Sequence, residues 1–384
     1  MVVFGVTVGY SHKLLGGVPL ALASDGWDVH IVSSLNEEWN WVPTPQIRHH
    51  NIPMKREIAP LADFLSFLRW VRILDQVRPN AVVIGTPKAA LLGLAAAWLM
   101  RIPVRIYHLR GLRLDTATGL KRIILLGIER LCSGFSTRIL SVSTSLSERY
   151  RAMGLAGRLS PIVLAKGSSH GVDIDRFAPL AREMRKQVRD DLGFDGNLPV
   201  IGFVGRFCAD KGVELLLSTR RSLLDRGIDH QLLIVGPVED SAPVLAGLES
   251  LGNCLHIGHT ATPELYYGVM DLLLLPSRRE GFPNAILEAA AMGVPCVSSD
   301  ATGCVDAVID GVTGFIAPLR TSRVFAERVA GLLSDEELAT SFGSSARKRA
   351  LEEFSQAKVE KAFVSFLNAQ VHWSPNPVAD EVNR

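Results

Sequence analysis

Short apolar runs alternate with longer amphipathic segments along the whole chain. In the first half these runs predict strands at 2–8, 28–34, 81–85, 104–109, 138–142 and 161–165. In the second half they predict strands at 200–204, 231–235, 254–257, 271–275, 296–299 and 314–316. Strands that alternate with helices indicate parallel sheets, so the predicted fold class is α/β. Two such series predict two Rossmann-like domains whose ligands bind beyond the carboxyl ends of the strands.

Three of the intervening segments predict helices of different kinds. Residues 61–76 carry apolar side chains at helical spacing with Arg69 and Arg72 beside them, a stripe made of Phe64, Phe67, Leu68, Val71 and Leu74. Such a stripe fits a core-facing helix, which we favour, or a helix lying in a membrane interface. Residues 120–132 are also amphipathic. The apolar segment 89–100 is shorter than the roughly 18 residues of a membrane span and predicts a buried helix.

A turn-like and then charged stretch at about 168–195 predicts the domain boundary. We therefore expect an N-terminal domain at 1–172 and a C-terminal domain at 173–354. A last helix at about 355–370 is expected to pack back on the N-terminal domain, and residues 371–384 are expected to form a loose tail. The D-x-D triplet at 173–175 lies in this predicted linker, and we do not interpret it as a metal site.

Charge is unevenly distributed, although the net charge of the 384 residues is only +2. Residues 1–175 hold 20 Lys and Arg against 12 Asp and Glu, whereas the rest of the chain holds 21 against 27. The basic half either meets an anionic surface, such as phospholipid heads, or reflects chance. The first residues read as a strand without a basic leader, and the five cysteines form no C-x-x-C pair. A reduced cytoplasmic setting is therefore expected.

The most informative motif covers residues 279–288, which follow the predicted strand 271–275 and begin a helix. We predict Pro283 at the first helical position and Gly293 just past the helix end. The N–H groups at such a helix start attract phosphate. Glu280 and Glu288 bracket this start, and their carboxylates can accept hydrogen bonds from hydroxyls. The arrangement suits a sugar linked to a nucleotide diphosphate.

A second loop presents Arg206 and Lys211 between the predicted strand 200–204 and a helix that begins near Val213. Cations are unfavourable at a helix start, so their presence favours an anionic ligand over a plain surface pair. After the first strand the chain has Gly16-Gly17 in place of a dinucleotide fingerprint. This pair either lets the backbone approach a phosphate or forms an ordinary turn. There is no Walker A loop and no convincing metal cluster, so we predict no cofactor and no metal.

Four motifs together resemble the signature of glycosyltransferase family 4. They are Gly-Arg-x4-Lys-Gly at 205–212, Glu-Gly-Phe-Pro-Asn at 280–284 with Glu288, Gly-Val-Pro at 293–295, and Gly-Val-Thr-Gly-Phe at 311–315. The resemblance implies a GT-B fold, with two Rossmann-like domains facing a deep cleft, and transfer with retention of anomeric configuration. Segments 56–61, 86–89, 109–113 and 302–306 more narrowly resemble bacterial enzymes that extend polyprenyl-diphosphate-linked saccharides.

The resemblance also implies roles for individual residues. Arg206 and Lys211 would hold the donor diphosphate, Glu280 would contact donor-sugar hydroxyls, and Glu288 would accept hydrogen bonds from the ribose. The backbone at the two loops would approach the sugar and phosphate, a set made of Gly205, Phe282, Pro283, Asn284 and Ala285. Gly16 and Gly17 would close over the phosphates from the opposite domain.

The acceptor side departs from the family pattern. The family often has His before Gly where this chain has Arg110-Gly111, with His108 two residues earlier. Arg110 is expected either to grip an acceptor phosphate or to belong, with Arg113, to a solvated loop. Lys88 completes the acceptor-side candidates.

The resulting expectation is a hexosyl- or N-acetylhexosaminyl-transferase. It would move a sugar from a nucleotide sugar, with UDP favoured, to a lipid-linked saccharide in cell-surface polysaccharide or glycan biosynthesis. It would be a cytoplasmic protein, peripheral at the inner face of the cytoplasmic membrane, with no nucleic-acid partner. Alternatives are a sugar-nucleotide epimerase of the same fold and a non-catalytic two-lobed sugar-binding protein. A Rossmann oxidoreductase is opposed by the missing dinucleotide fingerprint.

Overall fold

A computed structural model of the chain describes residues 1–35, 45–55 and 59–371. The predicted tail beyond Val371 and residues 56–58 of the segment at 56–61 lie outside this range. The chain divides into two units: Met1–His170 together with the segment that begins at Gln356, and Gly171–Ser355. In each unit, all strand pairs are parallel, as the alternation of strands and helices predicted.

The described part of unit 1 contains one sheet with the strand order β3-β2-β1-β4-β5-β6-β7. Its strands are β1 (Val2–Val8), β2 (Val29–Ser34), β3 (Ile47–Asn51), β4 (Ala81–Gly85), β5 (Val104–Leu109), β6 (Arg138–Ser141) and β7 (Ile162–Val163). Its helices are α1 (Val18–Ser24), α2 (Pro60–Val77), α3 (Pro87–Leu99), α4 (Gly119–Phe135), α5 (Thr144–Ala152) and α14 (Gln356–Val371). Two 3-10 turns, η1 (Gly9–Leu14) and η2 (Arg113–Asp115), follow β1 and β5.

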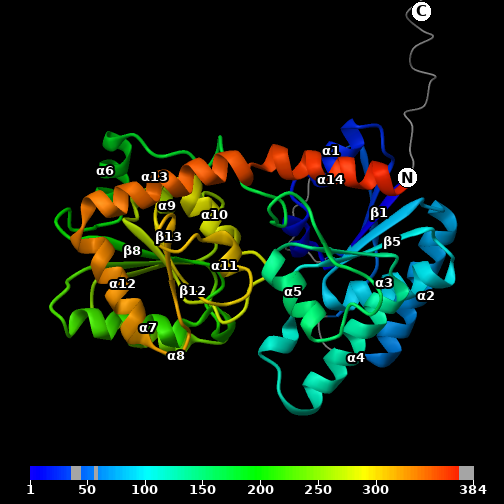
Figure 1. Ribbon diagram of the computed structural model, residues 1–384, viewed down its shortest axis with the longest axis horizontal. Coiled ribbons are helices and arrows are strands. Elements are labelled where there is room, and N and C mark those ends of the chain that lie inside the picture. The colour runs from blue at the N-terminus through cyan, green and yellow to red at the C-terminus, as the bar shows by residue number, and fades with distance from the viewer. Residues whose placement is uncertain (36–44, 56–58, 372–384) are drawn as a thin grey trace, which may run out of the picture. The chain divides into compact units, whose positions relative to one another are not determined.

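Helices cover both faces of this sheet (Figure 1). On one face Phe363 and Leu367 of α14 join Phe4 and Leu22 in the main hydrophobic core. On the other face the fully buried Trp70 of α2 lies over β1, where a Cβ on Gly5 would approach its ring to 2.8 Å. Glycine at position 5 is therefore what lets α2 pack closely on the sheet.

The stripe of α2 predicted to face the core does so only in part, since Leu74 is buried and Phe67 and Val71 are half-buried. Ser66, Trp70, Leu74 and Val77 are the buried residues of the helix, whereas Phe64 and Leu68 are exposed. The side of α2 that contains the large Trp70 faces the sheet, and it overlaps the predicted stripe at Leu74. In α3 the predicted burial is confirmed for six residues between Ala89 and Ala97, whereas Trp98 and Leu99 are exposed. Within the described residues, none of the helices combines the length and the apolar character needed to cross a membrane.

The predicted strands of unit 1 are confirmed, with one omission and one shortening. The edge strand β3 was not predicted, because only Ile47 of its residues is buried and the strand lacks an apolar run. Its histidines bind polar groups of β2 instead: His49 Nε2 lies 2.9 Å from Ser33 Oγ, and His50 Nε2 lies 2.7 Å from His30 Nδ1. The strand predicted at 161–165 shrinks to two residues.

The described part of unit 2 contains a sheet with the strand order β10-β9-β8-β11-β12-β13. Its strands are β8 (Val200–Val204), β9 (Gln231–Val235), β10 (Cys254–Ile257), β11 (Leu272–Leu275), β12 (Cys296–Ser299) and β13 (Gly314–Ala317), all close to the predicted positions. Its helices are α6 (Arg182–Asp191), α7 (Val213–Leu224), α8 (Ala242–Glu249), α9 (Pro263–Val269), α10 (Asn284–Ala291), α11 (Cys304–Ala307), α12 (Ser322–Ser334) and α13 (Glu336–Glu353). The 3-10 turn η3 (Ala209–Lys211) precedes α7.

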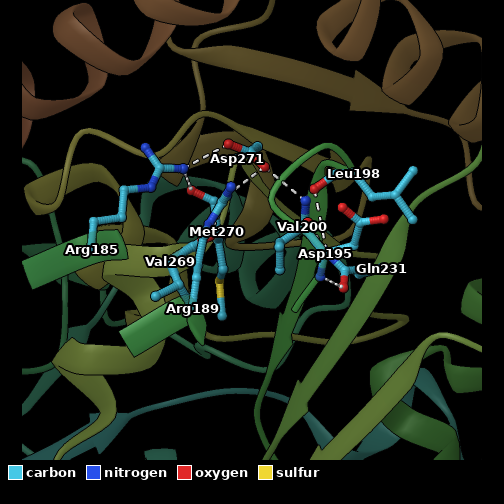
Figure 2. Close-up of polar contacts among 9 residues, drawn as sticks. All are labelled: Arg185, Arg189, Asp195, Leu198, Val200, Gln231, Val269, Met270 and Asp271. Carbon is cyan, nitrogen blue, oxygen red and sulfur yellow. Dashed lines mark hydrogen bonds and ion pairs between the residues drawn. The ribbon is translucent and has the colours of Figure 1, made fainter. Parts of the chain in front are cut away.

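The charged stretch predicted as a linker contributes directly to the second sheet. Figure 2 shows Arg185 and Arg189 of α6 on the carboxylate of Asp271, at distances of 2.6 and 2.7 Å. The same carboxylate accepts the backbone N–H of Val200 at 2.7 Å. Asp271 therefore ties α6 to the amino ends of β8 and β11. Charged hydrogen bonds of this kind are among the stronger ones in proteins.

Candidate active site

Three of the predicted donor residues, Arg206, Lys211 and Glu280, lie on two loops that meet at the topological switch point of the second sheet. β8 and β11 are neighbours, and the chain leaves β8 toward β9 and β10 before it returns to β11 on the other side. In open α/β sheets, ligands bind outside the carboxyl ends of the strands at such a point. Arg206 and Lys211 come from the loop after β8, and Glu280 comes from the loop after β11.

The loop after β8 is held tightly from both sides. The buried Phe207 donates its backbone N–H to Pro237 O at 2.8 Å, and its carbonyl accepts the N–H of Glu239. Gly212 has a φ of 71°, and a Cβ at this position would overlap the carbonyl oxygen of Pro276 at the end of β11. Glycine therefore allows the two loops to touch.

Two ion pairs join these loops, and we call them the clasp. Lys211 Nζ lies 2.5 Å from Glu280 Oε1, and the neighbouring Asp210 pairs with Arg279. The backbone also takes part, because the N–H of Arg278 donates to Asp210 O at 2.9 Å. Lys211 and Glu280, predicted separately from two motifs, are thus brought together. Asp210 and Arg279 were missed as functional candidates, although each adjoins a predicted residue.

Arg206 points to a different partner. Its guanidinium lies 2.6 Å from Glu239 Oε2, on the loop after β9, and its side chain keeps 41% of its surface exposed. Burial by itself would lower the pKa of Arg206, but the charge and hydrogen bond of Glu239, together with Cys208 and Asp210, raise the net pKa. The structure therefore places Arg206 on the loop of Lys211 and pairs it with a carboxylate that the sequence had not singled out.

The loop before α10 corrects one prediction. Pro283 is the N-cap residue with a ψ of 105°, and Asn284 is the first helical residue, with Ala285 next. The prediction of Pro283 at the first helical position was wrong by one residue: the backbone of Pro283 is extended, and the ring of Phe282 just before it makes a buried contact with Phe354. The predicted end is confirmed: the N–H groups after Met292 bond back to α10 carbonyls in a Schellman motif, with Gly293 at a φ of 76°.

Glu288 has a protein partner that sequence reasoning missed. The hydroxyl of Tyr267, on α9, donates to Glu288 Oε2 at 2.7 Å. Tyr267 is fully buried, and burial followed by the Glu288 charge raises the pKa of its hydroxyl well above the ordinary value. The hydroxyl therefore stays protonated and fixes the carboxylate one turn inside α10.

The surroundings of Glu280 hold no activated thiol. Burial, followed by the Glu280 charge, raises the pKa of Cys304 to about 12, so its thiol stays protonated. In the described ranges there is no group of three or more His, Cys, Asp or Glu side chains suited to a metal ion. In the D-x-D triplet, Asp173 Oδ1 accepts the N–H groups of Asp175 and Arg176, at 3.2 and 3.1 Å.

In unit 1 the corresponding switch point lies between β1 and β4, and Gly16 and Gly17 follow β1. Gly16 has a φ of 54°, and a Cβ at this position would overlap the His170 side chain. A Cβ on Gly17 would overlap the carboxylate of Glu360 on α14. Side chains of the same unit therefore account for both glycines. Gly16 also lines a small hollow with His12, Leu15, Pro19, Leu20, Ile31 and Ile47.

The acceptor-side candidates lie at the same edge of the sheet, and Lys88, His108 and Arg110 have internal partners. Arg110 donates to Leu14 O at 2.5 Å and to His108 Nδ1 at 3.0 Å. Burial, then the Arg110 charge, lowers the pKa of His108 well below its usual range, so the ring is neutral. Lys88 Nζ lies 2.7 Å from Asp63 Oδ1 of α2, and Arg113 is exposed on η2. Arg110 therefore links the loop after β1 to the end of β5.

Comparisons with known proteins agree with this architecture. Residues 20–164 match the family model described as "Glycosyl transferase 4-like domain", and residues 184–349 match "Glycosyl transferases group 1". The chain is 34% identical to the capsular polysaccharide biosynthesis glycosyltransferase CapM of Staphylococcus aureus, over 94% of this chain and 95% of that protein. It is 26% identical to the N,N'-diacetylbacillosaminyl-diphospho-undecaprenol alpha-1,3-N-acetylgalactosaminyltransferase of Campylobacter jejuni, over 78% and 79% of the two chains.

Among solved structures, the fold resembles that of HepE from Anabaena in complex with UDP-glucose. The TM-score is 0.74 at 17% identity, over 96% of this chain and 99% of that one. At this identity the likeness concerns the fold alone. The predicted GT-B class, with two Rossmann-like domains, is confirmed.

Proposed function

Because the chain belongs to glycosyltransferase family 4, we propose that it transfers a sugar from a nucleotide-diphosphate sugar to a lipid-linked saccharide. We further propose UDP as the nucleotide and cell-surface polysaccharide assembly, capsular or otherwise, as the setting. The UDP-glucose complex of the structural neighbour supports the first choice, and the names of the two relatives support the second. Unit 2 is the donor side and unit 1 the acceptor side.

The observation that carries the donor assignment is the Lys211 ammonium held at the switch point by Glu280. An ammonium has three N–H donors, and the bond to Glu280 uses one, so the others remain available to a diphosphate. The second Glu280 oxygen can accept a sugar hydroxyl at the same time. Arg206 contributes a forked donor from the same loop, and the start of α10 contributes backbone N–H groups.

Glu288 is proposed to accept hydrogen bonds from the ribose. Its Oε2 accepts the hydroxyl of Tyr267, so a fixed neighbour orients the carboxylate. A carboxylate whose rotamer is locked in this way loses less entropy when it binds a hydroxyl.

The proposed reaction breaks the bond between the anomeric carbon and the diphosphate oxygen. An acceptor hydroxyl oxygen forms the new bond on the same face, and its proton passes to the departing diphosphate. Negative charge grows on the leaving group, and the Lys211 and Arg206 cations stabilise it without reorganisation. One such contact contributes about 3 kcal/mol to lowering the barrier in comparable sites.

On the acceptor side we propose Arg110 and Arg113 as the groups nearest to an acceptor phosphate, with Lys88 and His108 at the same edge. The relative from Campylobacter jejuni is named for a diphospho-undecaprenol acceptor, which supports a polyprenyl carrier here. Such an acceptor would keep the enzyme peripheral at the inner face of the cytoplasmic membrane.

The test is product analysis with a panel of radiolabelled UDP- and GDP-sugars and a polyprenyl-diphosphate-linked saccharide. We expect label to move into the lipid fraction from a UDP-sugar, with the anomeric configuration retained. Conversion of the sugar nucleotide without acceptor would favour an epimerase instead. A product of inverted configuration would contradict the proposed same-face attack.

A further inference from the structure

Exposed apolar side chains gather on three helices of unit 1. Sixteen large apolar side chains are exposed in the part of the chain that the structure describes, and ten of them belong to α2, α3 and α4. We call these ten the apolar face: Leu61, Phe64, Leu65, Leu68, Trp98, Leu99, Leu120, Ile123, Ile124 and Leu131. Concentrations of this kind mark interaction sites, whereas single exposed apolar residues are ordinary.

The three helices form one layer on the same side of the first sheet, with α3 between α2 and α4 (Figure 1). Trp70 of α2 packs over Gly93 of α3, and the rings of Trp98 and Phe135 tie the end of α3 to the end of α4 at 5.5 Å between centroids. The apolar face is therefore carried by one rigid layer.

Helix α4 buries polar side chains and exposes apolar ones, the reverse of a usual helix in water. Its buried side includes Glu129, whose carboxyl accepts the hydroxyls of Tyr107 and Tyr150 at 2.8 and 3.2 Å. Its outer side carries Leu120 and Ile123, which are 71% and 65% exposed. Soluble helices normally bury the apolar side and expose the polar one. This pattern fits a helix whose outer side meets an apolar phase.

The charges among the apolar residues have nearly one sign. The exposed charged side chains on these helices are the cations Arg69, Arg72, Lys121 and Arg130 and the single anion Asp75. Apolar side chains flanked by Arg and Lys are typical of helices that lie in the interface of an anionic bilayer.

We propose that the apolar face docks unit 1 on the surface of a bilayer that contains anionic phospholipid. The proposal rests on the proposed function, because such a bilayer holds a lipid-linked acceptor. Helices that follow parallel strands begin at the carboxyl edge of the sheet, so the first turns of α2 and α4 lie at the edge that carries the acceptor-side residues. Asp63, in the first turn of α2 next to Phe64, bonds Lys88 directly.

The test is sedimentation of the full chain with vesicles of phosphatidylcholine containing about one third phosphatidylglycerol. We expect binding to these vesicles, weaker binding to pure phosphatidylcholine, and release as salt rises from about 0.1 M to about 0.5 M. A variant with four polar replacements, F64S/L68S/L120S/I123S, should lose about tenfold or more of its vesicle affinity. A second variant, R69Q/R72Q/K121Q/R130Q, should keep its weak binding to phosphatidylcholine and lose the preference for anionic vesicles.

The matched control is M184S/V312S, which removes two similarly exposed apolar side chains of unit 2 and should bind vesicles like the wild type. Wild-type affinity in the four-serine variant would overturn the proposal. So would a wild-type dimer that the same variant dissociates, because the face would then bind a second copy. Transfer to a short-chain, water-soluble acceptor should be unchanged in all these variants. If the wild-type protein bound the vesicles but transferred sugar to no acceptor, the result would count against the proposed function and would not contradict the docking face.

Discussion

The ion pair between Lys211 and Glu280 allows a sharp separation of structure from catalysis. Its atoms lie 2.5 Å apart, and the two side chains are only 18% and 11% exposed. The perturbation is a cycle of three variants: Lys211→Met, Glu280→Gln and the double variant. Met keeps most of the lysine stem, and Gln keeps the shape of the glutamate, so each change removes charge with little loss of packing.

Each single variant leaves one nearly buried charge without its partner. Breaking a fully buried pair costs about 3–5 kcal/mol, and the remaining exposure here brings the expected cost to about 2–3 kcal/mol. For a unit of this size this corresponds to a fall in Tm of about 5–10 °C. The double variant carries neither charge and should recover to within about 1 kcal/mol of the wild type.

Activity should behave differently from stability. Lys211→Met removes a cation from the leaving diphosphate, so kcat should fall about 100- to 1000-fold. The double variant should remain as inactive as the single ones, although it is as stable as the wild type. Calorimetry and steady-state kinetics on the same preparations make the comparison.

The control is the neighbouring pair between Arg278 and Glu214, which joins the same segments at 2.9 Å but is 47% and 65% exposed. Replacing Arg278 with Met should cost less than about 1 kcal/mol and leave kcat unchanged. Recovery of activity in the double variant of Lys211 and Glu280 would refute a catalytic role for the lysine and reduce the pair to a structural bridge.

Three further predictions follow from other contacts. Tyr267→Phe should raise the donor KM about fivefold with kcat little changed, because the tyrosine directs the proposed ribose-binding carboxylate; Tyr266→Phe is the control, and equal KM values would contradict this. Asp271→Ala should lower stability by about 2–3 kcal/mol, measured by calorimetry, without affecting the KM, since it removes charged hydrogen bonds at the amino ends of the strands. Burial lowers the pKa of His12 from 6.5 to about 4, so the stability that the neutral ring provides is lost as the pH falls through that range. Burial raises the pKa of Glu129 from 4.5 to about 7, so the stability that the protonated carboxyl provides is present at low pH and is lost as the pH rises. The two oppose each other between about pH 4.5 and 6.5, and Glu129→Gln should therefore make acid destabilisation steeper than in the wild type; parallel curves would contradict the assignment.

The strands could be predicted because a buried parallel strand needs a continuous apolar run, and Leu272–Leu275 is an example. The edge strand β3 was not predicted because its side chains form hydrogen bonds with polar neighbours and do not pack in the hydrophobic core. The orientation of α2 was predicted only in part, for another reason. A helical period reveals that apolar stripes exist, but which stripe meets the sheet depends on space at Gly5, a residue far away in the sequence.

The candidate site divides in the same way. Arg206, Lys211 and Glu280 could be proposed from the sequence because each lies on a short loop whose chemistry is local. Tyr267 could not, because it comes from a different helix and only the fold brings it to Glu288. The clasp could be predicted only in part. The sequence shows that Asp210-Lys211 and Arg279-Glu280 carry opposite charges in opposite order, and so could form two ion pairs. Only the register of the two loops, fixed by the contact of Gly212 with Pro276, turns that order into two ion pairs.

The two units share a topology, but the polar groups at their switch points have different partners. This difference bears on where the donor binds. In unit 1 the groups at the switch point bond one another: Arg110 spans the Leu14 carbonyl and the neutral ring of His108. In unit 2 the corresponding loops present Lys211 and Arg206, each paired with a carboxylate that keeps the cation oriented. An anion that enters unit 2 therefore meets two cations whose positions are already fixed by carboxylates, whereas Arg110 in unit 1 is held by a carbonyl and a neutral ring. Preorganised charge is what a leaving diphosphate requires, so this asymmetry favours unit 2 as the donor side.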